Sequence, residues 1–289
     1  MAVRLDGDVL FQYRRFTLYN SPYAAHDHGH AVDLYPAPGE PVPSPVAGEV
    51  LETKRVRAPD RPYAADHDSL VLVDTDECVA RLLHVDPTVA AGDRVAVGEP
   101  LGDPIRAGFF APWVPNHVHL GFRTPEQDPY RASGSLPIEI GVEVRPLDWD
   151  GTGTVVETGE TWARLDSPAH PDPGETFVGL AAGDPRAGDR TERPVLDGGF
   201  PHYDGGGLIG GTTSSPAVCG TPVGTVSGEQ AEGSGTAVSW ADVTVRANGD
   251  PVTGLALFCA RDRFGVKLVG RDLDFEVGET VAVTVERDG

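Results

Sequence analysis

The apolar segments of this chain are short, rich in valine and closely bounded by glycine, proline or aspartate. Glycine occurs 36 times and proline 26 times among 289 residues, so turns interrupt the chain too often for long helices. Segments such as 69–74, 118–122 and 280–285 alternate in polarity or are β-branched, which is typical of strands. No segment has the periodicity of an amphipathic helix of three or more turns. The sequence therefore predicts an all-β protein.

The chain is long enough for two domains of ordinary size, each with its own core. We expect a boundary near residue 146, which gives domains 1–146 and 147–289. The second domain is predicted to be a β-sandwich or a partly open barrel, and its role is not indicated. Within it we expect a long irregular excursion over 168–211, ending in a flexible glycine turn at 205–211.

The balance of charged residues limits the partners that this protein can have. Acidic residues number 44 and basic residues 23, which gives a formal net charge of −21, and the only lysines are Lys54 and Lys267. Nucleic acid is disfavoured because its binding requires cations that neutralise phosphates. An Asp-rich chain nearly free of Lys resembles the proteins of salt-loving archaea, whose hydrated acidic surfaces tolerate high salt. We therefore interpret the charge as surface solvation in a halophilic protein.

Neither the N-terminal segment nor the cysteines indicate export. Residues 2–16 contain five charged side chains, so no apolar stretch is long enough for a signal sequence or a membrane span. Cys78, Cys219 and Cys259 are widely separated, which favours small buried apolar side chains over disulfides or metal ligands. We expect a cytoplasmic protein that does not bind membranes. Its oligomeric state is not indicated.

Histidines are concentrated before residue 120, where seven of the nine occur. His117 and His119 lie two positions apart in a predicted strand, so their side chains share one face and can meet one ion or one substrate. His67 is expected in a loop, and His170 and His202 in turns without a functional role. The uneven distribution indicates a histidine-based site in the first domain.

The motifs between residues 20 and 125 follow a definite order. They are a His/Asp segment at 26–36 that contains Asp33, a Pro-Val segment at 41–50, then His84, a glycine-rich hairpin at 89–102 and His-x-His-x-x-Phe at 117–122. This order resembles that of the lysostaphin-type zinc metallopeptidases, which cut peptide cross-bridges in bacterial cell walls. The resemblance implies a duplicated hybrid motif fold for the first domain. It also implies a zinc-dependent hydrolase that acts on a peptide or related amide.

Residue by residue, the resemblance implies that Asp33 and His119 ligate zinc together with one upstream histidine. His84 and His117 would then flank the open coordination position, where they orient the attacking water and stabilise the tetrahedral oxyanion. This chemistry is consistent with the residue types. Two imidazoles and one carboxylate leave the cation with a net positive charge, which lowers the pKa of a bound water.

The third zinc ligand is the point at which this chain departs from the family. The family places a histidine four residues before the aspartate, and that position here is Gly29. His28 and His30 lie at odd offsets from Asp33, so both would face away from it in a regular strand. A bulge at Gly29 would bring His28 into phase, and a kink would admit His30. We expect one of these two histidines to be the third ligand.

Two other functions are consistent with the same residues. A degenerate peptidase fold can serve as a non-catalytic binding or scaffold protein, and Gly29 and the missing export signal favour this alternative. The glycine-rich hairpin also occurs in carrier domains, one of which carries phosphate on histidine, so His84 or His117 could accept a phosphoryl group. Metal content separates the hydrolase from the scaffold, and a mass gain after incubation with a phosphohistidine donor tests the carrier.

Overall fold

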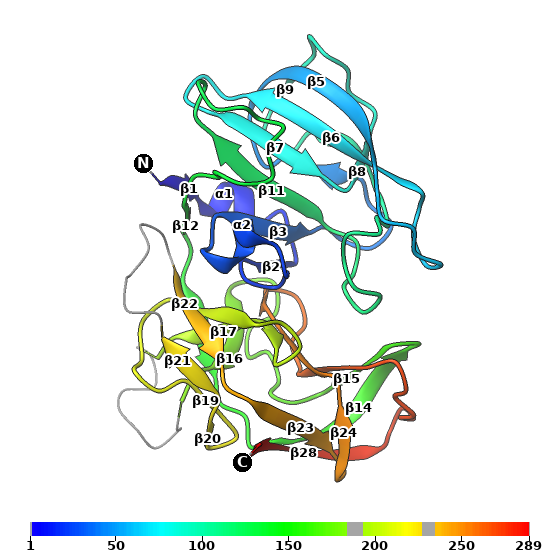
Figure 1. Ribbon diagram of the computed structural model, residues 1–289, viewed down its shortest axis with the longest axis vertical. Helices are drawn as coiled ribbons and strands as arrows, with labels where there is room; N and C mark the ends of the chain where they lie inside the picture. The colour runs from blue at the N-terminus through cyan, green and yellow to red at the C-terminus, as the bar shows by residue number, and fades with distance from the viewer. Residues whose placement is uncertain (1, 184–192, 227–234, 289) are drawn as a thin grey trace. The chain divides into compact units, whose positions relative to one another are not determined.

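A computed structural model describes residues 2–183, 193–226 and 235–288, and strands account for nearly all of its regular structure (Figure 1). Only two helices occur in these ranges, α1 (Gly7–Leu10) and α2 (Ala24–Asp27), and each has four residues. The all-β class expected from the sequence is confirmed. Neither of these helices is long and apolar enough to cross a membrane.

The chain divides into two compact units. The N-terminal unit comprises residues 1–16 and 30–142, and the C-terminal unit comprises residues 17–29 and 143–289. We expected the chain to change domains near residue 146, and the units change between residues 142 and 143. The sequence did not indicate the short excursion at 17–29, because no local pattern shows which unit a short segment packs against.

The N-terminal unit is built on a central antiparallel sheet in the order β3-β11-β7-β6-β5-β9 (Figure 1). A second small sheet has the order β4-β10-β8, and β1 pairs with β12. The strands of this unit are β1 (Val3–Leu5), β2 (Arg15–Thr17), β3 (Ala31–Tyr35), β4 (Val42–Pro43), β5 (Gly48–Arg57), β6 (His67–Asp74), β7 (Val79–Leu83), β8 (Val85–Pro87), β9 (Arg94–Val95), β10 (Pro100–Pro104), β11 (Val118–Arg123) and β12 (Ile138–Ile140).

The two faces of the central sheet differ in chemistry. Successive side chains of a strand point to opposite faces, so alternate residues form two sets. One face buries the apolar residues Val32, Leu82, Leu120 and Phe122. The other face carries Asp33 and His119, which lie directly opposite each other on β3 and β11. This second face, called the histidine face below, positions the candidate site.

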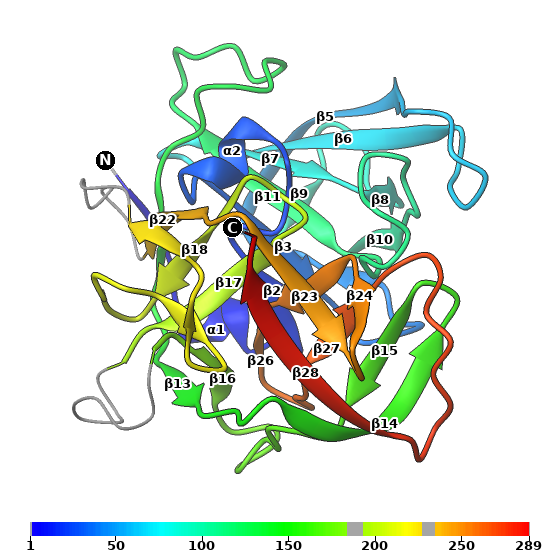
Figure 2. The same ribbon diagram turned by 60° about the horizontal axis from the view of Figure 1, so that its bottom comes forward.

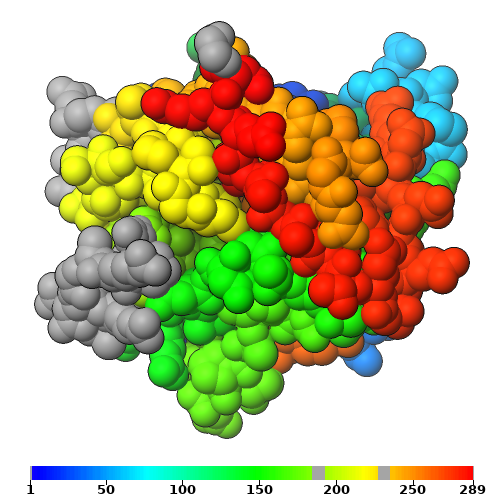
Figure 3. All heavy atoms as spheres, turned by 90° about the horizontal axis from the view of Figure 1, so that it is seen from below, coloured from blue at the N-terminus to red at the C-terminus, as the bar shows by residue number. Residues whose placement is uncertain are grey.

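The C-terminal unit forms one continuous ladder of antiparallel pairs, β21-β22-β18-β17-β25-β27-β15-β14-β28-β23-β24. Figure 2 shows β28 in red running past β14, and Figure 3 shows one face of the surface of the same unit. Its remaining strands, β13, β16 and β26, join the ladder through β16 and β17, and β19 pairs with β20. The bounds are β13 (Val144–Leu147), β14 (Thr152–Gly159), β15 (Trp162–Leu165), β16 (Phe177–Ala181), β17 (Val195–Phe200), β18 (Gly205–Ile209), β19 (Ala217–Val218), β20 (Thr221–Pro222), β21 (Gly224–Val226), β22 (Gly235–Trp240), β23 (Val243–Ala247), β24 (Asp250–Val252), β25 (Gly254–Leu257), β26 (Cys259–Ala260), β27 (Lys267–Val269) and β28 (Thr280–Arg287).

The irregular excursion expected over 168–211 is wrong for the described part of that segment, which contains three buried strands, β16, β17 and β18; residues 184–192 lie outside the described ranges. The glycine run is not a turn, because Gly205–Ile209 is β18, paired on both sides. A side chain on Gly207 would collide with the ring of Tyr19, and one on Gly206 with the ring of Trp240. Glycine is therefore needed here so that aromatic rings can lie against the strand backbone.

Two smaller expectations have different outcomes. His67 is not in a loop, because it is the first residue of β6 and lies opposite Arg57 of β5. The cysteines are free, and the expected burial holds for Cys78 and Cys259, whereas Cys219 is only half-buried. Burial raises the pKa of the Cys219 thiol to about 11, so this thiol is protonated at neutral pH.

Candidate metal and hydrolase site

Asp33 and His119 form a cross-strand pair on the histidine face, and His117 joins them. The backbone register of β3 and β11 places Asp33 opposite His119, and their side chains approach to 3.0 Å between Oδ1 and Nδ1. Nε2 of His117 lies 3.5 Å from the other carboxylate oxygen of Asp33. Asp33 is 3% exposed and His117 is 2% exposed. One buried carboxylate thus faces two imidazoles.

A hydrogen bond of His117 determines which of its nitrogens carries the hydrogen. Nδ1 lies 2.9 Å from the carbonyl oxygen of Pro115, which can only accept, so Nδ1 carries the hydrogen. In the neutral ring, Nε2 then directs a lone pair towards Asp33. Nε2 of His117 and the carboxylate oxygen of Asp33 are both electron-rich and repel each other. Because a buried carboxylate also needs a compensating charge, this arrangement requires a proton or a metal cation nearby.

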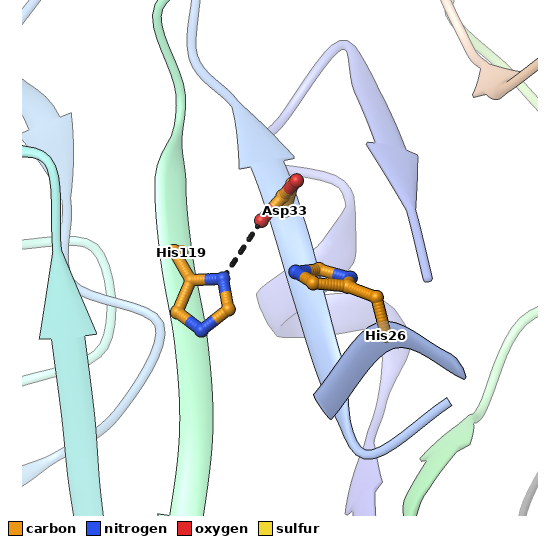
Figure 4. Close-up of side chains that lie close together, drawn as sticks. All are labelled: His26, Asp33 and His119. Carbon is orange, nitrogen blue, oxygen red and sulfur yellow. Dashed lines mark hydrogen bonds and ion pairs between the residues drawn. The ribbon is translucent and has the colours of Figure 1, made fainter. Parts of the chain in front are cut away.

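A third imidazole, that of His26, is also held by a backbone carbonyl at its Nδ1. His26 lies in α2 and is 2% exposed, and its Nδ1 is 2.6 Å from the carbonyl oxygen of Leu18. Its Nδ1 therefore donates, which leaves Nε2 with a lone pair. Figure 4 shows the outer ring nitrogen of His26 turned towards Asp33 and His119. Ligand atoms of these three residues lie within 4.8 Å of one another.

This donor set fits a divalent transition metal such as zinc. Zinc binds histidine nitrogen and carboxylate oxygen at roughly 2.0–2.2 Å, which places neighbouring tetrahedral ligands about 3.3 Å apart. The Asp33–His119 separation of 3.0 Å is close to that value. Nδ1 of His26 donates to the backbone carbonyl of Leu18, and metal-bound histidines usually have a hydrogen-bond partner of this type at their second ring nitrogen.

The structure places the two expected third ligands outside this group of three. His28 is exposed and His30 is half-buried, and both precede the first residue of β3, so the offset rule for a strand does not apply to them. Gly29 has a φ of +66°, and a Cβ there would lie 2.8 Å from the hydroxyl of Tyr19. A histidine at position 29 is thereby disfavoured, because L-residues rarely adopt this backbone conformation.

His84 adjoins the same cluster from the junction of β7 and β8. Its ring centroid lies 5.0 Å from that of His117 and 6.0 Å from that of His119. Its φ of +70° is unusual for a residue other than glycine, and such backbone strain is concentrated at functional sites. The structure therefore brings together His84, His117, His119 and Asp33, which are four of the six residues that the sequence predicted for this site.

Asp68 holds His84 in this conformation. One carboxylate oxygen of Asp68 accepts from the backbone N–H of His84 at 2.9 Å, and the other lies 2.6 Å from Nδ1 of the ring. Asp68 is fully buried. Burial alone would raise the pKa of Asp68, but hydrogen bonds from His84 and Ser69 hold that pKa below its ordinary value. The ionised Asp68 fixes the hydrogen of His84 on Nδ1, which leaves Nε2 able to accept a proton.

Aromatic side chains surround these imidazoles. The ring of Phe110 lies 4.5 Å from that of His117 and 5.1 Å from that of His84, measured between centroids. The ring of Tyr35 lies 5.2 Å from that of His117. These contacts restrict the rotation of both imidazoles and lower the polarity around them.

Comparison with protein families identifies both parts of the chain. Residues 4–140 match the N-terminal domain of DUF8155, a domain of unknown function, and residues 145–286 match its C-terminal domain. The chain belongs to the DUF8155 family. No curated protein matches this DUF8155 chain.

Two members of the DUF8155 site were not assigned a role from the sequence. His26 lies in the same His-rich segment as His28 and His30, but its position at the site depends on the short helix α2. No periodic pattern in the sequence predicted this helix. Asp68 stands beside His67 at the start of a predicted strand. Its partner His84 is 16 residues away, so only the pairing of β6 with β7 brings the two together.

Proposed function

We propose that this protein is a metal-dependent hydrolase that acts on a peptide or related amide. The observation that carries this proposal is the buried Asp33 carboxylate, which faces the ring nitrogens of His117 and His119. The order of motifs shared with lysostaphin-type peptidases supports the same activity and a fold of the duplicated hybrid type.

In this proposal Asp33, His119 and His26 hold the cation, and zinc is the metal best suited to two nitrogens and one oxygen. When bound, zinc supplies Lewis-acid polarisation of an amide carbonyl and of water. His84, with its hydrogen fixed on Nδ1 by Asp68, presents Nε2 as a proton acceptor. His117 has the same tautomer, held by the carbonyl of Pro115, and stands beside it.

Measurement of bound zinc in the purified full-length protein tests the proposal. We expect one zinc per chain after metal removal and reloading, and cleavage of unstructured synthetic peptides that is detected by mass spectrometry. His119→Ala should abolish both. His170→Ala, in the C-terminal unit, is the matched control and should abolish neither. A protein that folds normally yet takes up no stoichiometric transition metal contradicts the proposal.

A second series of variants identifies the third ligand. We expect His26→Ala to weaken zinc binding at least about 100-fold, because it removes a direct ligand. His28→Ala and His30→Ala, which remove the ligands expected from the sequence, should each change the affinity less than about threefold. A larger loss in His28→Ala or His30→Ala than in His26→Ala would return the role to the residue concerned.

The carboxylate beside His117 argues against the phosphate carrier. A phosphoryl group on His117 would place its negative charge beside the carboxylate of Asp33, 3.5 Å from Nε2.

A further inference from the structure

Arg81 lies on the histidine face close to His119. On β7, Leu83 is directly opposite His119, and Arg81 is two residues earlier on the same face. Arg81 and His119 are therefore diagonal neighbours, roughly 7–8 Å apart and with their Cβ atoms somewhat closer. The residue directly opposite Arg81 is Gly121, and the side chain of Ser135 lies over it, with its hydroxyl 3.2 Å from the position that a Cβ on Gly121 would take.

A second guanidinium, that of Arg123, lies next along β11 on the same face. Arg123 is 1% exposed, and neutral oxygens hold it, among them the carbonyls of Phe122 and Arg131. Its Nε is buried without a hydrogen-bond partner. Burial and the nearby charge of Arg123 lower the pKa of Arg81 to about 10, so both side chains are cationic at neutral pH.

These two cations have no carboxylate partner. Among the described residues, neither Arg81 nor Arg123 forms an ion pair, and Nε of Arg81 donates to the carbonyl oxygen of Pro129 at 3.1 Å. Asp68 is close enough to favour the charge on Arg81, but its oxygens are bonded to His84 and Ser69. The chain has 44 acidic residues for 23 basic ones, so an unpaired cation pair is unexpected. Arg123 is buried and donates three hydrogen bonds to neutral oxygens, whereas Arg81 is half-buried, so an anion that reaches Arg81 from outside would supply the opposite charge that both side chains lack.

We propose that Arg81, with Arg123 behind it, binds a carboxylate of the peptide substrate beside the metal site. A guanidinium fork matches the two oxygens of a carboxylate, which makes arginine the suitable residue for this task. The catalytic meaning of this subsite rests on the proposed hydrolase function, but carboxylate binding itself requires no metal. The carboxylate belongs either to the C-terminus of the peptide or to an Asp or Glu side chain near the cleaved amide.

Peptide binding to the full-length protein, measured by calorimetry with and without zinc, tests this inference. Acetyl-Ala-Ala-Ala is compared with its C-terminal amide, and acetyl-Ala-Glu-Ala-amide with acetyl-Ala-Gln-Ala-amide. We expect at least one acidic peptide to bind 10-fold or more tightly than its neutral counterpart. The pair that shows the difference identifies the source of the carboxylate. Equal binding in both pairs, or no binding by any peptide, overturns the inference.

Variants connect the preference to this residue. Arg81→Gln should remove the preference, and Arg81→Lys, which keeps the charge but loses the fork, should retain part of it. Arg131→Gln changes an exposed arginine of the adjacent loop and should have no effect. An unchanged preference in Arg81→Gln overturns the inference, and since the wild-type peptide pairs need no variant, misfolding of one variant does not prevent the test.

The metal and the carboxylate outcomes are independent. If the protein binds acidic peptides selectively but takes up no zinc, the hydrolase proposal fails and the carboxylate subsite stands. If zinc binds stoichiometrically and no peptide pair is distinguished, the subsite fails and the hydrolase proposal stands.

Discussion

The two units bury carboxylates in different ways. In the C-terminal unit, Asp197 is fully buried and accepts backbone N–H bonds from Leu18 at 2.6 Å and Tyr19 at 3.0 Å. In the N-terminal unit, Asp33 is equally inaccessible but faces the imidazoles of His117 and His119. Backbone donors cannot move or titrate, so Asp197 has a structural environment. Ring nitrogens can exchange a proton for a metal, so the environment of Asp33 is suited to a metal site.

The side chains around these two carboxylates differ in polarity in the same way. The interior of the C-terminal unit is an almost continuous apolar cluster that contains Phe200, Leu208 and Leu255. The histidine face of the N-terminal unit instead places arginines, histidines and carboxylates on one side of its central sheet. Burial of polar groups that are not fully paired reduces stability. The comparison therefore predicts that stability is concentrated in the apolar core and that chemistry is concentrated on the histidine face.

The strongest test of this separation is a cavity in the C-terminal core. Phe200 is fully buried, and its ring lies 5.2 Å from that of Trp240. Phe200→Ala should lower the free energy of unfolding by about 3–5 kcal/mol, measured by denaturant titration with tryptophan fluorescence. Zinc binding by the folded variant should be unchanged. Val156→Ala, at a position that is 39% exposed, is the control with a small effect. A matching fall in zinc affinity would break the separation.

The pH dependence of stability gives the next largest effect. Burial lowers the pKa of His202 to about 4, from 6.5 in the unfolded chain. The unfolded state binds more protons between these values, so the stabilisation is complete above pH 6.5 and declines as the pH falls towards 4, by up to about 3 kcal/mol. His202→Gln should flatten this part of the profile, and His170→Gln should preserve it. An identical slope in His202→Gln would assign the dependence to other groups.

Removal of the Asp68 charge tests whether the histidine face is organised for chemistry. Asp68→Asn should reduce peptide hydrolysis about 100-fold, because an amide replaces the charged carboxylate that accepts the hydrogen on Nδ1 of His84. Zinc content should not change, since Asp68 is not among the proposed ligands. Asp66→Asn, two residues away and exposed, is the matched control. If both variants lose the same activity, Asp68 has no particular role in positioning His84.

The smallest predicted effect concerns the glycines of β18. Gly207→Ala should destabilise the protein by about 2 kcal/mol, because the new methyl group would collide with the ring of Tyr19. In a Tyr19→Ala background the same substitution should cost much less, and this non-additivity is measured by a double-mutant cycle. Ser239→Ala, at an exposed position on the neighbouring strand β22, is the control. Additive costs would show that the two side chains are not in contact.

Local patterns were sufficient for the class of fold and for much of the site. Alternating or β-branched runs correctly predicted β6, β11 and β28, because side-chain alternation is a property of each strand alone. His117 and His119 both reach Asp33, as their spacing indicated, but His117 precedes the first residue of β11, so strand alternation does not account for its position. The failures occurred at β17 and β18, where small and glycine-rich segments are strands only because neighbouring strands and aromatic rings cover them.

The amino-acid sequence alone determined the all-β class, the acidic net charge and the set of histidines available for a site, because composition and periodicity act over a few neighbouring residues. Tertiary structure decided which of these groups meet. The antiparallel pairing of β3 with β11 placed Asp33 opposite His119, 86 residues later, and the pairing of β6 with β7 brought Asp68 to His84. Tertiary structure also placed His26 beside Asp33 and His119, in the position that the sequence assigned to His28 or His30. Strand register depends on contacts between distant segments, and no local pattern encodes it.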